Sequence, residues 1–162
     1  MVTRRTVLKA GLGGAVLLAL GSTAALLIGR DPVRDREQVL RALIPAVLDG
    51  ALPLDEPQRS AAISATLNDT LVALNALAPE TQRELAQLFA LLALPPLRRV
   101  LAGVPVNWNS ASVAEVSEFL SSWRTHRLGL LQGAYHGLNE LVIGPWYAQP
   151  GHWEAIGYAG PP

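Results

Sequence analysis

Apolar side chains recur at helical spacing along most of this chain, and proline or glycine interrupts the pattern between segments. Residues three and four positions apart share one helix face, so this spacing predicts amphipathic helices packed on one another. The residues expected to face inward are Val39, Leu40, Leu43, Ile44, Val47, Leu48, Ile63, Leu67, Leu71, Leu74, Leu85, Leu88, Phe89, Leu92, Val116, Phe119, Leu120, Trp123, Leu128, Leu131, Tyr135, Leu138 and Val142.

Local signals mark where these helices begin and end. A first helix is expected over residues 33–49, a second from Asp55, a third from Pro79 to Pro95-Pro96, and a fifth over residues 128–142, with a short helix near residues 97–101. Ser112 and Glu115 form a capping-box pattern that opens the fourth. Alternating strand-like runs are missing. We therefore predict an all-α bundle of about five helices over residues 31–143.

The chain contains no cysteine. Disulfides, iron–sulfur clusters and thiolate zinc sites are excluded on that ground. Packing alone must hold the fold together.

Charge is distributed unevenly. Four of the thirteen bases (Arg4, Arg5, Lys9, Arg30) lie near the N-terminus, and the remainder carries nine bases against thirteen acids, a net charge of −4. A nucleic-acid-binding domain normally carries a basic patch, so nucleic acid is not an expected partner.

The first thirty residues follow the order of an export signal. Residues 3–9 read TRRTVLK, and residues 10–29 carry no charge. This resembles a twin-arginine leader, in which Arg4 and Arg5 are an address read by the twin-arginine translocase. The prediction is a periplasmic protein; the alternative is an ordinary membrane anchor with chance arginines.

The fate of this leader stays open. Residues 22–24 (STA) offer small residues for cleavage. Twenty helical residues span about 30 Å, the thickness of a bilayer core, so residues 10–29 could also remain as an inner-membrane tether.

Residues 144–162 differ from the rest. Prolines and glycines there predict an irregular tail rather than a long helix. Trp146, Tyr147, Trp153 and Tyr158 lie within thirteen residues. Two readings stay open: the tail folds back on its own bundle, or these aromatics dock a partner, as Trp and Tyr often do.

No catalytic, cofactor-binding or metal-binding residue is assigned. The three histidines, His126, His136 and His152, have no metal-ligand spacing. No GxSxG elbow or phosphate-binding glycine pattern stands in a suitable context.

The C-terminal half carries a family resemblance. The residues concerned are SEFLSSW (117–123), Arg127, Leu128, Tyr135, WYAQP (146–150) and WEAIGYAGP (153–161), with Leu43-Ile44-Pro45 near the first helix. They resemble the small subunits of membrane-associated flavin dehydrogenases, of the gluconate 2-dehydrogenase subunit 3 type.

That resemblance implies a non-catalytic accessory subunit. The expected partner is a large FAD-dependent alcohol or sugar dehydrogenase of the glucose–methanol–choline type, which holds the FAD and commonly lacks its own leader. The resemblance implies that electrons then pass to a cytochrome subunit or a quinone. The alternatives are a stand-alone membrane-tethered periplasmic interaction protein and an unrecognised enzyme or redox carrier.

Overall fold

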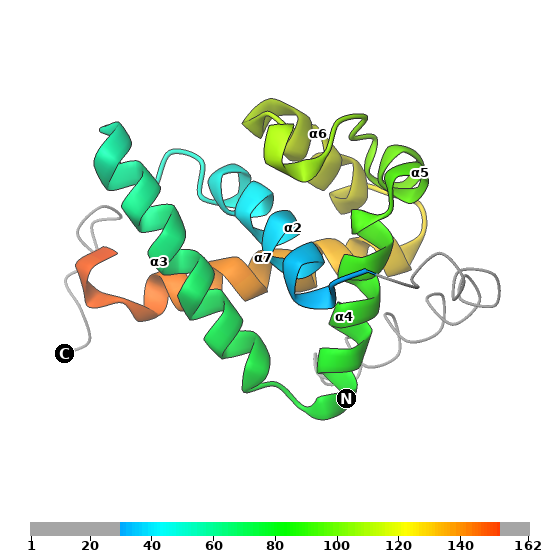
Figure 1. Ribbon diagram of the computed structural model, residues 1–162, viewed down its shortest axis with the longest axis horizontal. Coiled ribbons are helices and arrows are strands. Elements are labelled where there is room, and N and C mark those ends of the chain that lie inside the picture. Colours follow the sequence, from blue (N-terminus) through cyan, green and yellow to red (C-terminus); the bar gives the residue numbers. More distant parts are fainter. Residues whose placement is uncertain (1–29, 153–162) are drawn as a thin grey trace.

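The computed structural model describes residues 30–152, whose regular secondary structure consists of helices and helical turns, with no strand among these residues (Figure 1). The predicted sites at Arg4, Arg5, residues 10–29, Trp153 and Tyr158 lie outside the described residues. The elements are α2 (Pro32–Val47), α3 (Glu56–Asn75), α4 (Pro79–Ala93), α5 (Pro95–Leu97), the π-helical turn η2 (Arg98–Ala102), the 3-10 turn η3 (Trp108–Ser110), α6 (Val113–Arg124), α7 (Gly129–Ala148) and the 3-10 turn η4 (Pro150–His152).

The all-α prediction is confirmed, and the long helices of the described part start close to the expected residues. Asp31 caps α2 by accepting hydrogen bonds from the backbone N–H of Val33 and Arg34, and Asp55 caps α3. Prolines occupy the first or second position of α2, α3 and α4, where a missing N–H costs nothing. No single helix of residues 30–152 is long and apolar enough to cross a membrane; α4 passes only when joined to Pro95–Ala102, across an 83° bend.

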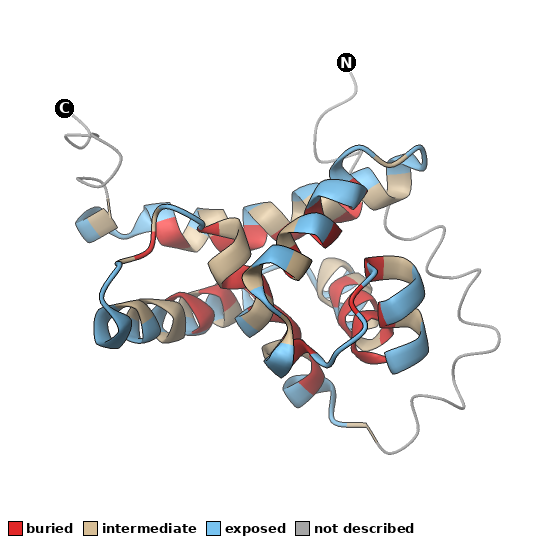
Figure 2. Ribbon diagram, turned by 90° about the horizontal axis from the view of Figure 1, so that it is seen from above, coloured by how far each residue is buried: buried red, intermediate tan, exposed pale blue. Residues whose placement is uncertain are grey.

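Helix α2 is the centre of the bundle and packs against α3, α4, α6 and α7 (Figure 1). Buried residues follow the sides on which the helices face one another (Figure 2). Val39, Leu40, Leu43 and Ile44 of α2 are fully buried. The predicted inward faces are therefore confirmed for this helix, and most other predicted core positions are buried or packed against the core.

Leu128 is the clear exception, since its side chain is 58% exposed. The prediction that it faces inward was wrong because α7 begins one residue later, at Gly129, and Leu128 is the residue before the helix. The next apolar position, Leu131, packs against the core.

Two tryptophans tie the segment between α4 and α6 to the core. The indole N–H of Trp108 donates to the carbonyl of Leu92 at 2.8 Å, and that of Trp123 donates to the carbonyl of Leu101 at 2.7 Å. Phe119 lies between them, with ring centroids 5.9 Å from Trp108 and 4.7 Å from Trp123. A buried indole N–H needs such an acceptor. These two hydrogen bonds therefore hold the α4–α6 connection in place, while the two rings fill the core.

Helix α7 extends further than the sequence predicts. It runs through Gly144 and Pro145 to Ala148, so the boundary expected at residue 144 falls inside a helix. Gly144 has no Cβ to meet the Pro145 ring, which relieves the usual clash before proline. An interior proline costs about 3 kcal/mol, whereas burying an indole such as Trp146 contributes roughly 4–6 kcal/mol at ~25 cal/mol per Å². Burial outweighs the lost hydrogen bond.

The predicted capping box at the start of α6 is present. Glu115 accepts hydrogen bonds from the backbone N–H and the hydroxyl of Ser112, both at 2.8 Å, and the Ser112 hydroxyl accepts from the Glu115 N–H. The backbone and hydroxyl hydrogen bonds from Ser112 lower the pKa of Glu115. Because the charged form is favoured by folding, Glu115 stabilises the fold above its unfolded pKa, near 4.5, and this contribution is lost as the pH falls through the lowered folded value.

We expect Glu115→Gln to lower the melting temperature at pH 7 and to lower it less at a pH of about 3, because protonation of the carboxyl then removes part of the charge that the capping bonds favour. Thermal unfolding of both proteins at the two pH values measures this. An equal loss at both would mean that the charge contributes nothing. Glu118→Gln, on the same helix without a capping bond to Ser112, is the control.

Candidate functional site

A groove of about 1040 Å³ lies between the C-terminal half of α3, the start of α4 and the C-terminal half of α7. Residues 76–78, which join α3 to α4, belong to this lining, and α7 passes behind α3 in Figure 1. We call it the α3–α4–α7 groove. Its lining residues are Asp69, Val72, Ala73, Ala76, Leu77, Ala78, Thr81, Glu84, Leu85, Gly137, Glu140, Leu141, Gly144, Pro145, Ala148 and Gln149.

The groove is mostly apolar, and six of its sixteen lining residues are alanine or glycine. Alanines and glycines let another backbone approach closely. Val72 is 70% exposed and Leu77 is 36% exposed, although both are large apolar residues. A contiguous apolar surface left open to water is typical of an interaction site.

The charged residues of the groove are all acidic. Asp69, Glu84 and Glu140 contribute one carboxylate from each helix, and no lysine, arginine or histidine is among the lining residues. The groove therefore favours an apolar occupant that carries positive charge at its edges.

The described chain ends beside this groove. The side chain of Gln149 donates to Asp69 of α3 at 3.1 Å, which joins the end of α7 to α3. The η4 turn then brings His152 back onto Trp146, where the two rings stack with centroids 3.6 Å apart and 10° between planes. His152 Nδ1 lies 2.8 Å from the Trp146 carbonyl and so acts as the donor.

Two of the predicted docking aromatics, Trp146 and Tyr147, lie within the described residues, and they differ in exposure. Trp146 is 3% exposed and belongs to the core, so its ring is not available to a partner in this conformation. The fold-back reading therefore holds for Trp146. Tyr147, the next residue along the helix, is 37% exposed. Of these two, Tyr147 alone remains in the proposed docking set, beside Trp153 and Tyr158, which lie outside the described residues.

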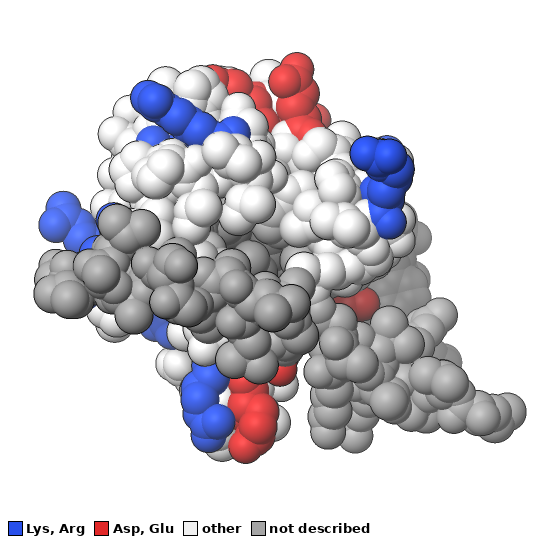
Figure 3. Space-filling view, turned by 90° about the vertical axis from the view of Figure 1, so that its right-hand side faces the viewer, with Lys and Arg blue, Asp and Glu red and all other residues white. Residues whose placement is uncertain are grey.

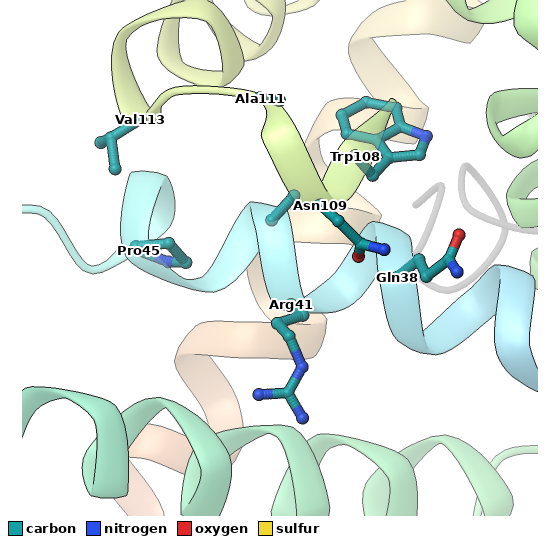
Figure 4. Close-up of a pocket in the computed structure, with 8 residues that line it drawn as sticks. Gln38, Arg41, Pro45, Trp108, Asn109, Ala111 and Val113 are labelled. Carbon is teal, nitrogen blue, oxygen red and sulfur yellow. The ribbon is translucent and has the colours of Figure 1, made fainter. Parts of the chain in front are cut away.

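A smaller cleft of about 320 Å³ lies between α2 and the η3 turn. Its lining residues are Gln38, Arg41, Ala42, Pro45, Trp108, Asn109, Ala111 and Val113. Arg41 extends away from the other labelled residues (Figure 4). Arg41 is also the one ionisable side chain of this lining, so the cleft does not assemble a nucleophile with a base or an acid–base pair.

The histidines of the described part have local roles. His126 Nδ1 accepts a hydrogen bond from the Leu128 N–H at 3.1 Å, just before α7, and the His136 ring packs edge-on against Tyr135. Within residues 30–152, no three His, Asp or Glu side chains gather in a way that could hold a metal ion. On the side face drawn in Figure 3, the described charged side chains lie mainly near the margins of an uncharged surface, and a basic and an acidic group lie side by side at the lower edge.

Sequence periodicity did not reveal the groove. Val72 lies off the predicted inward face of the second helix, and Leu77 lies in the connection that follows it. The signal that could have found them is the presence of large apolar residues at positions expected to be polar. Comparison of the chain with protein-family models, with curated proteins and with solved structures gives no match. Function is therefore argued from the residues themselves.

Proposed function

We propose that this chain is a non-catalytic accessory subunit that binds a folded FAD-dependent alcohol or sugar dehydrogenase and carries it through twin-arginine export. The α3–α4–α7 groove is the observation that carries the proposal. An apolar groove between helices is a common receptor for an amphipathic segment of another protein. The residues of the leader and of the C-terminal signature support the same reading.

The groove suits a protein segment better than a reacting small molecule. Its carboxylates come from three helices, and no histidine or lysine is among the lining residues. Such a surface stabilises a partner by burying apolar area, and binding to the native form alone raises the partner's stability by mass action.

Such a subunit would be needed for the export of a folded complex. FAD is inserted in the cytoplasm, and a folded flavoprotein that lacks a leader needs one from an associated chain. Arg4 and Arg5 supply that address in this proposal. The periplasmic location, the translocase and a following cytochrome subunit belong to the same proposal, and the FAD is held by the partner.

The direct test is co-expression with a flavoprotein of the glucose–methanol–choline type that lacks a leader, and a neighbouring gene that encodes one would supply the candidate. An affinity tag at residue 162 of this chain should recover the flavoprotein, with flavin absorbance in proportion to it. A flavoprotein that is folded and flavin-loaded in the lysate but absent from the recovered fraction would end the proposal.

We expect Ala76→Trp to weaken this complex by at least about tenfold, or ~1.4 kcal/mol. Ala76 is exposed and lines the groove, so an indole there occupies the space that the partner needs. Ala65→Trp is the matched control, because Ala65 is an exposed alanine of α3 that does not line the groove. Titration of the purified flavoprotein with each variant gives the dissociation constants. Equal weakening by both would place the interface elsewhere.

The groove also suits a stand-alone periplasmic interaction protein. That function is favoured if the Ala76→Trp variant loses a defined partner that contains no flavin while Ala65→Trp keeps it.

A further inference from the structure

We propose that the α3–α4–α7 groove also binds this chain's own leader, residues 1–29, before the partner arrives. The contact itself needs no flavoprotein. The consequence drawn from it, that the partner displaces the leader, rests on the proposed function.

Charge selects the leader among the parts of the chain that lie outside the described residues. Residues 1–29 carry Arg4, Arg5 and Lys9 and no acid. Residues 153–162 carry one charged side chain, Glu154. The three carboxylates of the groove attract the first segment and repel the second.

Apolar character points to the same segment. The groove exposes Val72 and Leu77, and six of its other lining residues are alanine or glycine. Residues 10–29 contain no charge and include Val16, Leu17, Leu18 and Leu20. Binding them in the groove would bury their apolar side chains together with the apolar surface of the groove.

The leader can reach the groove. It joins the described chain at Arg30, whose guanidinium binds Asp35 through two hydrogen bonds of 2.8 and 2.7 Å and the Ala93 carbonyl at 3.2 Å. Leu85 of the groove precedes Ala93 by eight residues on α4, which is about 12 Å along the helix. Twenty-nine extended residues can span roughly 95 Å.

This arrangement would make export depend on assembly. With residues 10–29 in the groove, Arg4 and Arg5 lie near its acidic edge and are less accessible to the translocase. A partner that fills the groove releases the leader. An empty subunit is then exported less efficiently than a loaded complex.

Disulfide trapping tests the contact in the full chain. The protein has no cysteine of its own, so any disulfide joins the two that are introduced. We pair Leu17→Cys with Ala76→Cys, which lines the groove, or with Ala86→Cys, an exposed alanine of α4 outside the lining. Ala86 is only seven residues from Ala93, so a leader without a preferred site should reach it at least as fast.

We expect the Leu17–Ala76 pair to form an intramolecular disulfide at least about tenfold faster than the Leu17–Ala86 pair during mild oxidation without detergent, since a bond requires Cα atoms within about 7 Å. Gel mobility under non-reducing conditions separates intramolecular from intermolecular products. Circular dichroism of each variant confirms that the helices are formed. Equal rates for the two pairs would overturn the inference.

Charge reversal supplies a second measurement. Glu84→Lys with Glu140→Lys should slow the Leu17–Ala76 disulfide roughly five- to tenfold, and Arg4→Glu with Arg5→Glu should restore it. Glu118→Lys, an exposed charge of α6, should have no effect. Insensitivity to the reversal at the groove would also overturn the inference. Flavoprotein binding without leader trapping would reject this inference alone, whereas leader trapping without flavoprotein binding would reject the proposed function.

Discussion

Replacing Arg4 and Arg5 together with lysine is expected to leave this protein in the cytoplasm. Lysine keeps both charges but lacks the planar donor fork of a guanidinium, so a receptor that reads two arginines loses its contacts. We expect the periplasmic fraction to fall close to zero, measured by cell fractionation against marker enzymes for each compartment. Arg34→Lys with Arg41→Lys, two exposed bases of α2, is the control.

The same cells report on the partner. If this chain supplies the address for a leaderless flavoprotein, that protein should remain in the cytoplasm with the double variant and should still be bound to it. Unchanged export of this chain would reject the twin-arginine prediction. Loss of its export with normal export of the flavoprotein would keep the leader but reject the escort role.

Trp146→Ala is expected to destabilise the fold by about 3–5 kcal/mol. The indole is 3% exposed, lies in the core cluster and stacks on His152. Domains of this size are commonly stable by only about 5–15 kcal/mol, so most of the margin could be lost. Urea unfolding followed by circular dichroism gives the change in the free energy of unfolding.

Tyr147→Ala is the neighbouring comparison, with an expected change of at most about 1 kcal/mol because the side chain is 37% exposed. In the flavoprotein titration, Tyr147→Ala should weaken binding while leaving the fold intact. If Trp146→Ala kept full stability and lost the partner, its ring would be a docking residue after all, as the sequence suggests.

The bundle was predictable because local signals and burial agree. The caps at Asp31, Asp55 and Ser112 fix where helices start, and the spacing of Val39, Leu40 and Leu43 fixes which face is buried. Both are properties of a few neighbouring residues. They can be read without knowing which helix packs against which.

The end of α7 and the groove depend on packing between distant segments. A local rule ends a helix before Pro145, yet burial of Trp146 carries the helix onward. The groove is lined jointly by α3, α4 and α7. Its acidic residues are at positions 69, 84 and 140. No short-range pattern brings those three positions together. The leader and the remaining aromatic residues lie outside the described part and stay predictions.

The ion pair between Arg30 and Asp35 has a mechanical consequence. Because the Arg30 guanidinium also binds the Ala93 carbonyl, the first described residue is attached both to the start of α2 and to the end of α4. Traction on the N-terminal segment is thus shared between two helices of the core. A pull on residue 30 is therefore passed directly to α2, the central helix, and through the Ala93 carbonyl to α4.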